Sequence, residues 1–282
     1  MHDRNSNRQP SQTRPSQTMQ PLTQFTTADR AQIGYLLCDI DDTLTTDGVL
    51  VPAAYSAIGE LAASGMQIVP ITGRPAGWCD HIARMWPVAG IVGENGAFYF
   101  RYDRAQKRMV RRFWKSPQQR AADRQRLELL QARILEAVPG CAVAADQAYR
   151  EADLAVDFCE DVPPLPSADV QRIKAVFEEH GAHAKISSIH VNGWFGEYDK
   201  LSMTRLFFRD LYEIELDAVR ERVAFCGDSP NDAPMFGYFN HSVGVANVRH
   251  FADILEAQPA YVTSAEGGEG FAELAAVLLA AR

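Results

Sequence analysis

Residues 33–43 read IGYLLCDIDDT, an apolar run that ends in three aspartates and a threonine. An apolar run without alternating polar residues is typical of a strand that is buried on both faces of a parallel sheet. Asp39 and Asp41 follow the run directly, where the carboxyl end of the strand would emerge from the sheet. This stretch therefore predicts a helix-covered parallel sheet with carboxylates at one edge.

Two other segments repeat the same design. Residues 66–74, MQIVPITGR, and residues 222–232, RVAFCGDSPND, are apolar runs that end in polar and glycine residues. Helical patterns occupy residues 53–65 and 75–86 between the first strands. Strands that alternate with helices at this spacing predict an α/β fold with a parallel sheet.

The middle of the chain has a different pattern. Residues 97–114 predict a hairpin, residues 118–138 a long polar helix, and residues 167–181 a second helix between further short strands. We therefore expect an inserted α+β module. The predicted domains are a core of residues 31–96 and 190–282, and an insert, or cap, of residues 97–189.

The first thirty residues differ in composition from the rest. They are rich in Gln, Ser, Thr, Pro and Arg and contain few large apolar side chains. Such a segment buries too little apolar surface to offset the entropy of ordering it, so residues 1–30 are predicted to form a disordered tail. The segment has no apolar stretch of the kind found in secretory signals.

Charge and composition exclude several functional classes. The net charge of -8 argues against a protein that binds nucleic acid through phosphate contacts. No apolar run approaches the roughly 20 residues that span a bilayer, so no membrane partner is expected. Five cysteines without a C-x-x-C pair favour a reducing compartment, and we expect a cytoplasmic protein. The oligomeric state stays open.

The polar strand ends suggest a metal site. Ligands bind outside the carboxyl ends of the strands in an open parallel sheet. If the three strands are neighbours, Asp39, Asp41, Asp228 and Asp232 converge beside Thr72. Crowded carboxylates repel one another, and a hard cation such as Mg²⁺, which prefers oxygen ligands, relieves the repulsion.

Each motif alone has a simpler interpretation. The stretch CGDSPNDAPMFG, residues 226–237, is rich in residues that form ordinary surface turns. An isolated D-x-D at residues 39–41, a Thr-Gly at the end of a strand, or a lysine that begins a helix is more often structural than functional. Only their joint occurrence in order along the predicted core favours a functional site.

That ordered set resembles the haloacid dehalogenase-like (HAD) phosphatases. It comprises DxDxT at residues 39–43, Thr72, Lys200 in an Asp-Lys pair, and GDSxND at residues 227–232. The insert between Thr72 and Lys200 is similar to the class IIB (C2B-type) cap, as found in sucrose-phosphate phosphatase, mannosyl-3-phosphoglycerate phosphatase and phosphomannomutase. The resemblance covers residues 33–282 and implies a Rossmann-like parallel-sheet core with an inserted α+β cap.

The resemblance also implies roles for single residues. Asp39 would be the nucleophile that forms an aspartyl-phosphate, and Asp41 the general acid and base. Thr72 would bind the transferring phosphoryl group, and Lys200 would balance its charge. The implied substrate-binding residues are Thr72, Gly73, Arg74 and Asn231. The implied Mg²⁺ site consists of Asp39, Asp228 and the main-chain carbonyl of Asp41. Asp232 belongs to the same site but would act indirectly, by orienting a water on the metal or Lys200.

The cap offers further candidates for substrate binding. His190, Asn192 and Trp194 alternate along one strand, so they share a face that either lines a pocket or packs within the sheet. These two interpretations are equally favoured. The overall hypothesis is a Mg²⁺-dependent phosphatase acting on a small phosphorylated metabolite, a sugar phosphate or sugar-acid phosphate. The alternatives are a phosphomutase of the phosphomannomutase type and a non-catalytic metabolite-binding protein.

Overall fold

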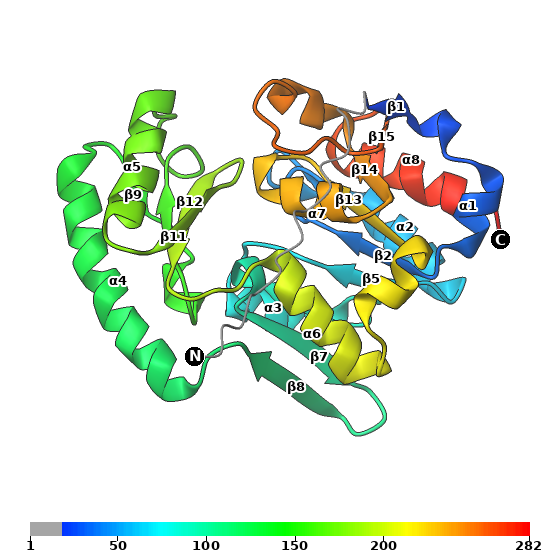
Figure 1. Cartoon of the computed structure of the whole chain (residues 1–282), viewed down its shortest axis with the longest axis horizontal. Helices are drawn as coiled ribbons and strands as arrows, with labels where there is room; N and C mark the ends of the chain where they lie inside the picture. Colours follow the sequence, from blue (N-terminus) through cyan, green and yellow to red (C-terminus); the bar gives the residue numbers. More distant parts are fainter. Residues whose placement is uncertain (1–18) are drawn as a thin grey trace, which may run out of the picture.

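The computed structural model describes residues 19–282, which form a larger core and a smaller cap (Figure 1). The core is built on a six-stranded sheet in which every neighbouring pair is parallel. In sheet order its strands are β1 (Gln20–Pro21), β15 (Tyr261–Val262), β14 (His241–Gly244), β13 (Val223–Gly227), β2 (Tyr35–Cys38) and β5 (Gln67–Pro70).

Helices cover both faces of this sheet. Successive residues of β2 point to opposite faces, so Leu36 packs in one apolar cluster and Leu37 in the other, and both are fully buried. The Leu36 side is covered by α2 (Pro52–Ala63), α3 (Ala76–Met85) and α8 (Gly267–Leu279), and the Leu37 side by α6 (Lys200–Tyr212) and α7 (Ala233–Tyr238). The continuous apolar runs of the sequence reflect this double burial.

The cap is an antiparallel sheet with two helices on one face. The helices and one face of the sheet share a separate apolar cluster that includes Ile134, Val156 and Phe177. The opposite face of the sheet, which carries His190 and Asn192, faces the core. The elements of the cap are α4 (Pro117–Ala137), β9 (Ala142–Val143), β10 (Leu154–Asp157), α5 (Ser167–Glu179), β11 (His183–Ile186) and β12 (His190–Trp194), with sheet order β11-β12-β10-β9.

A parallel α/β core with an inserted α+β cap is what the sequence predicted, and the fold confirms it. Among residues 19–282, none of the helices combines the length and apolar character needed to cross a bilayer.

The strand pairing differs from the predicted domain boundaries at both ends of the cap. The hairpin of β7 (Phe98–Asp103) and β8 (Arg108–Phe113) was predicted as part of the cap, but it pairs with β6 (Ile91–Gly93). Its Phe98 and Phe100 fill the core cluster beside α3. Conversely, β12 was placed in the core but lies at the centre of the cap sheet. The sequence pattern of a strand does not indicate which strand it pairs with. For this reason the hairpin was wrongly assigned to the cap and β12 to the core.

The predicted disordered tail is also corrected in part. Residues 1–18 lie outside the described residues, but Gln20 onward is ordered: β1 pairs with β15, and α1 (Thr27–Gln32) follows. Phe25 is fully buried, and its ring stacks on Tyr261 with the centroids 4.7 Å apart. The pairing of β1 with β15 and the burial of Leu22 and Phe25 attach to the core a segment whose overall composition is polar.

Candidate active site

The predicted strand ends meet at one edge of the core sheet. Strands β13, β2 and β5 are consecutive neighbours, and Asp228, Asp39 and Thr72 each follow one of them. Parallel strands place their carboxyl ends on the same edge, so these three side chains are brought together, and all three are buried.

Lys200 enters the same site from the start of α6. Asp199 caps this helix by accepting from the amide of Ser202, which fixes where the first helical residue lies. The Nζ of Lys200 donates to Asp39 at 3.1 Å and to Asp232 at 2.7 Å. Burial works to lower the pKa of Lys200, but the carboxylates of Asp232 and Asp39 raise it above its ordinary value, so the amine stays charged.

Three buried carboxylates form a compact oxygen cluster. One oxygen each of Asp39, Asp228 and Asp232 lie within 4.8 Å of one another. Burial raises the pKa of Asp39 to about 8 against the opposing charge of Lys200, and burial together with Asp232 raises that of Asp228. Neighbouring carboxylates resist ionisation together, and a bound cation removes that penalty.

The members of the cluster differ in how free their oxygens are. Both oxygens of Asp232 are engaged, one by Lys200 at 2.7 Å and the other by the amide of Asp228 at 3.1 Å. Asp228 accepts from the hydroxyl of Thr43 at 3.2 Å and from the Asn247 amide at 3.5 Å. Each contact of Asp228 is longer than both contacts of Asp232, and Asp39 accepts from Lys200 through one oxygen, so Asp39 and Asp228 are better placed than Asp232 to hold a cation directly.

Asp41 pairs with Arg74 rather than with the carboxylate cluster. The two side chains are 2.9 Å apart, and Arg74 also bonds Glu160 of the cap at 2.8 Å. Burial raises the pKa of Asp41, which favours its protonated form, while Arg74 acts in the opposite direction. Asp41 thus lies between the core and the cap.

The turn after β5 is shaped by Thr72 and Gly73. The hydroxyl of Thr72 accepts from the amide of Arg74 at 3.0 Å, so the turn closes on itself. A Cβ on Gly73 would lie only 3.2 Å from the Asn95 side chain, so a larger residue would push that side chain away. The small residue lets the turn lie close to its neighbours.

Two of the three predicted cap residues reach the site. His190 lies 2.9 Å from Glu160, and Asn192 donates to Asp153 at 2.9 Å. Both line a pocket with Asp39, Asp41, Gly73, Arg74, Arg150, Ser187, Ser188, Ile189, Ser229 and the predicted Asn231. Trp194 does not line this pocket: its ring stacks on Tyr198 with centroids 5.8 Å apart, and both rings belong to the core cluster.

The cap is closed over the pocket. The free space between these residues is about 10 Å³, close to the volume that one water needs. A second cavity of about 510 Å³ shares Ser187, Ser188 and Asn231 with it and lies between α5 and Phe251. A ligand larger than a water molecule would therefore require some separation of cap and core.

Several residues of the site were not predicted from the sequence. Arg150 and Glu160 lie in loops of the cap, where no pattern marks them. Glu94 is fully buried and follows β6. Asn247 follows β14, and a polar residue soon after a core strand is the same kind of signal that marks Asp39 and Asp228.

Comparisons of the whole chain with known proteins agree with this geometry at the level of the fold. No family model matches the chain, and a search of curated proteins gives no match. Solved structures do match. A putative HAD/COF-like hydrolase from Plasmodium vivax is 17% identical with a TM-score of 0.64, covering 91% of this chain and 100% of that one.

Two further structures are similar over comparable lengths. The sucrose-phosphatase of Synechocystis, solved with sucrose and phosphate, is 15% identical with a TM-score of 0.60 and covers 88% of this chain and 98% of that one. A Thermoplasma acidophilum protein is 17% identical with a TM-score of 0.66, covering 87% and 98%. This chain has the fold of the HAD hydrolases. At such low identities the likeness establishes the HAD fold with its cap, and the chemistry must be argued from the site.

Proposed function

We propose that the chain is a Mg²⁺-dependent HAD phosphatase that hydrolyses a small phosphorylated metabolite through an aspartyl-phosphate. The observation that carries the proposal is the contact of Lys200 with Asp39 at 3.1 Å inside a buried carboxylate cluster at the carboxyl edge of the sheet. A non-catalytic binding protein would have no need of a buried carboxylate held against a charged lysine.

In the first step, an oxygen of Asp39 attacks phosphorus and the bond to the leaving oxygen breaks. Asp41 gives its proton to that oxygen, and the metabolite leaves as an alcohol. In the second step, Asp41 takes a proton from water, which attacks the same phosphorus, and the bond to Asp39 breaks. Inorganic phosphate is released and both aspartates return to their starting forms.

The neighbouring residues hold the phosphoryl group during both steps. Lys200 opposes the negative charge of Asp39 and of the phosphoryl oxygens, and the Thr72 hydroxyl donates to one of those oxygens. Arg74 and Asn231, at the mouth of the pocket, contact the substrate as it enters. Phosphoryl transfer depends mostly on such positioning and on neutralisation of charge.

The donor set fits Mg²⁺. Carboxylate oxygens of Asp39 and Asp228, together with the Asp41 carbonyl, would hold the ion, while Asp232, bonded to Lys200 and to the Asp228 amide, would orient them. Mg²⁺ would lower the barrier by neutralising charge on the phosphoryl oxygens.

The polar lining of the pocket favours a polyhydroxylated substrate. His190, Asn192 and the two serines at 187 and 188 offer hydrogen bonds from the cap. The similar fold of the sucrose-phosphatase, solved with sucrose and phosphate, supports a sugar phosphate or sugar-acid phosphate. The closed pocket would exclude bulk water during transfer.

The experiment compares hydrolysis of p-nitrophenyl phosphate by the wild type and the Asp39→Asn variant, with Mg²⁺ and with EDTA. Activity that requires both Asp39 and Mg²⁺ supports the proposal, and full activity of Asp39→Asn overturns it. A panel of sugar phosphates then identifies the substrate class, with inorganic phosphate as the readout.

The phosphomutase alternative shares the chemistry up to the aspartyl-phosphate, and its one suggestive sequence feature is Gly193-Trp194, a pair that phosphomannomutase also has before its Asp-Lys. In this chain the pair has packing roles. A Cβ on Gly193 would lie 2.2 Å from the Phe177 ring, and Trp194 stacks on Tyr198. The pair therefore does not favour a mutase. An assay in which a hexose phosphate is isomerised without release of inorganic phosphate would still establish a mutase.

A further inference from the structure

The turn that follows β6 has an unusual backbone. Glu94, Asn95 and Gly96 have φ angles of 44°, 54° and 106°, so three consecutive residues are left-handed. For the two residues with side chains such conformations are unfavourable, and they persist only where the surroundings impose them. The contacts of this turn show what imposes them.

The carboxylate of Glu94 joins the core to the cap. One oxygen accepts from the Ala76 amide, at the start of α3 in the core, at 2.9 Å. The other accepts from the cap amides of Ala152 at 2.6 Å and Asp153 at 3.2 Å, and the Glu151 amide reaches both oxygens. Glu94 is fully buried. Burial and the charge of Asp153 raise the pKa of Glu94 to about 8, and the four backbone donors act in the opposite direction by stabilising the carboxylate that links core and cap.

The same turn also binds the main chain of the Thr72–Arg74 segment. The carbonyl of Thr72 accepts from the Asn95 amide at 3.1 Å, and that of Arg74 accepts from the Glu94 amide at 3.2 Å. The carbonyl between them, of Gly73, accepts from the guanidinium of Arg150 in the cap at 2.8 Å. All three consecutive carbonyls are therefore fixed, two by the turn and one by the cap.

The turn also touches the start of α6. A Cβ on Gly96 would lie 2.0 Å from the carbonyl oxygen of Asp199 and 3.0 Å from the amide of Lys200. Only glycine allows this approach. The turn of residues 94–96 therefore contacts the cap, the Thr72 segment and the base of Lys200 at once.

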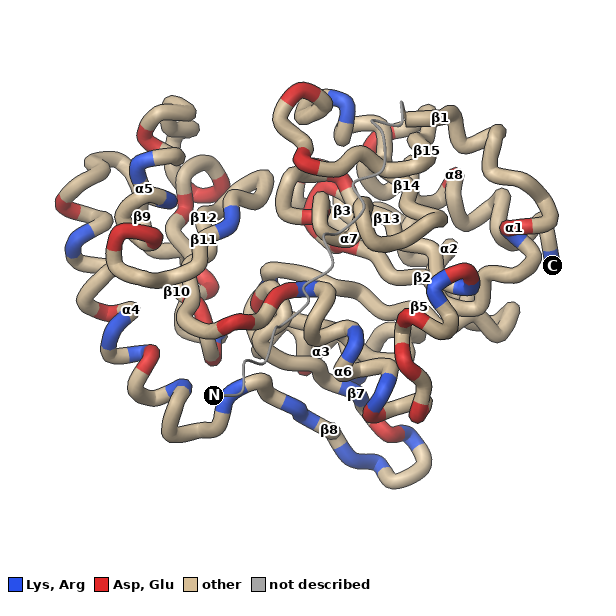
Figure 2. The backbone as a smooth tube through the Cα atoms, in the orientation of Figure 1, with Lys and Arg blue, Asp and Glu red and all other residues tan. Residues whose placement is uncertain are grey.

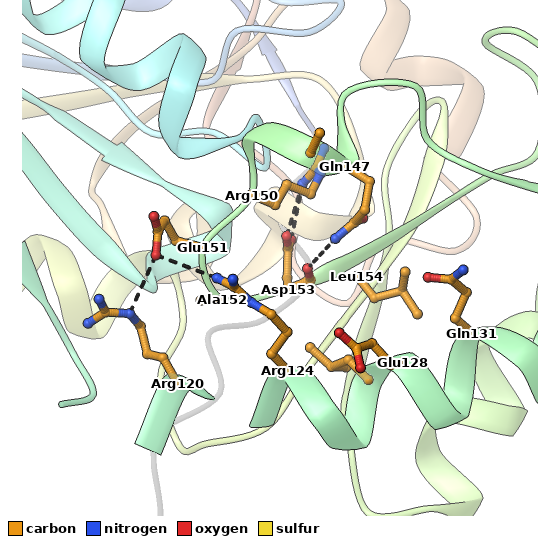
Figure 3. Close-up of a pocket in the computed structure, with 12 residues that line it drawn as sticks. Arg120, Arg124, Glu128, Gln131, Gln147, Arg150, Glu151, Ala152, Asp153 and Leu154 are labelled. Carbon is orange, nitrogen blue, oxygen red and sulfur yellow. Dashed lines mark hydrogen bonds and ion pairs between the residues drawn. The ribbon is translucent and has the colours of Figure 1, made fainter. Parts of the chain in front are cut away.

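The cap segment that Glu94 binds is weakly held on its other side. This segment borders a pocket with a volume of about 220 Å³. Gln147 and residues 150–154 line the pocket against α4, with Arg120 and Arg124 near Glu151 (Figure 3). These ion pairs span 3.8 and 3.7 Å, and the Glu151 side chain is 44% exposed, so they contribute little. This segment is thus anchored to the core by Glu94, which accepts from three of its amides, and by Arg150, which donates to Gly73.

We propose that Glu94 is a positioning residue that couples closure of the cap to the placement of Thr72 and Arg74, with Arg150 as its counterpart in the cap. The inference rests on the proposed phosphatase function. When the cap docks, the amides of residues 151–153 engage Glu94 and Arg150 reaches Gly73. When it leaves, both contacts are lost together, and the phosphate-binding turn loses a support on each side.

The Glu94→Gln variant tests the proposal because it preserves the size of the side chain. The glutamine side chain has only one oxygen that can accept, where the carboxylate of Glu94 has two. Its NH₂ group would face backbone N–H groups that also donate, so some of the present hydrogen bonds would be lost. We expect kcat/KM for p-nitrophenyl phosphate to fall at least tenfold. We also expect amide exchange to accelerate at residues 151–153 and at Arg74, whose amide donates to the Thr72 hydroxyl and not to the Glu94 side chain that the substitution changes. Exchange in β13 should not change.

Glu151→Ala is the matched control. It removes a side chain from the same segment but leaves the amide that binds Glu94, so activity and exchange should stay within twofold of the wild type. Wild-type turnover in Glu94→Gln, or faster exchange at residues 151–153 with Arg74 unchanged, would overturn the coupling.

A second variant keeps the test decisive if Glu94→Gln does not fold. Arg150→Lys retains a positive charge beside Asp146 and Asp153 but replaces the guanidinium that reaches Gly73. Faster exchange at Arg74 in this variant supports the coupling, and unchanged exchange contradicts it. The exchange measurement needs no activity, so an inactive wild type would refute the phosphatase proposal while leaving the coupling to be decided by exchange alone.

Discussion

The guanidinium of Arg74 donates to the carboxylate of Asp41 at 2.9 Å, and this pair stands where the core meets the cap. Arg74 reaches Glu160 at 2.8 Å and Asp146 at 3.5 Å on the cap side. Acidic positions lie on both sides of the space between the two bodies (Figure 2), and Arg74 is the cation that bridges them here. The environment of Asp41 therefore depends on where the cap lies.

Asp41→Asn should lower kcat by about a hundredfold or more, because the amide keeps the shape of the side chain but gives no proton to the leaving group. The loss in kcat/KM should be larger for an alkyl phosphate than for p-nitrophenyl phosphate, whose leaving group needs little protonation. Steady-state kinetics on both substrates checks this. The neighbouring Asp42→Asn serves as control and should retain activity, and equal losses in the two variants would contradict the assignment.

Mg²⁺ should raise the thermal stability of the protein. A ligand that binds only the folded state at a hundredfold excess over its Kd adds about 2.7 kcal/mol, and relief of repulsion at Asp39 and Asp228 is the physical source here. Differential scanning calorimetry with and without Mg²⁺ measures the shift. Asp228→Asn should abolish it, whereas Glu197→Gln, whose side chain is 92% exposed, should preserve it. A shift that survives Asp228→Asn would place the ion elsewhere.

The core half of the site was predictable because it depends on local signals. Asp39, Thr72 and Asp228 each end an apolar run, and the rule that ligands bind at the carboxyl edge brings them together. The cap half depends on contacts that no local pattern encodes. Arg150 and Glu160 lie in loops, and their importance comes only from facing Gly73 and Arg74 across the closed interface.

Strand partners were also beyond local patterns. The sequence predicts that residues 97–114 form a hairpin, but its place in the core comes from long-range contacts: the bridge between Ile71 and Val92 and the packing of Phe98 in the core cluster. Phe25 shows the same limit, because its stacking on Tyr261 and the pairing of β1 with β15 are long-range contacts that the composition of the segment does not reveal.

Glu160→Gln should destabilise the protein at neutral pH and have little effect in strong acid. The imidazole of His190, 2.9 Å from the carboxylate, and the hydrogen bond from Arg74 lower the pKa of Glu160 from 4.5 to about 2. A lowered folded-state pKa contributes stability above the unfolded value, and this contribution is lost as the pH falls towards 2. The difference in free energy of unfolding between wild type and variant should therefore shrink between pH 4.5 and 2.

Urea denaturation at several pH values measures that difference. Glu178→Gln is the matched control, since this glutamate makes only an exposed i,i+4 pair with Lys174. A difference between wild type and Glu160→Gln that stays constant from pH 6 to pH 3 would mean that Glu160 does not bear the charge that links cap and core.

Trp194 bears on stability rather than on the choice of substrate. Its position on the same strand face as His190 and Asn192 suggested a place in the pocket, but its side chain is 3% exposed and its indole nitrogen donates to the Tyr198 carbonyl at 3.3 Å.

Removal of so large a buried ring costs about 3–5 kcal/mol, so Trp194→Ala should lower the free energy of unfolding by that amount. Trp114→Ala, at a site 40% exposed, should cost clearly less. At a temperature where the variant is folded, turnover of the sugar phosphate and of p-nitrophenyl phosphate should change by the same factor. A rise in KM for the sugar phosphate alone would instead return Trp194 to the substrate-binding surface, because packing against Tyr198 cannot distinguish two substrates that share only a phosphoryl group.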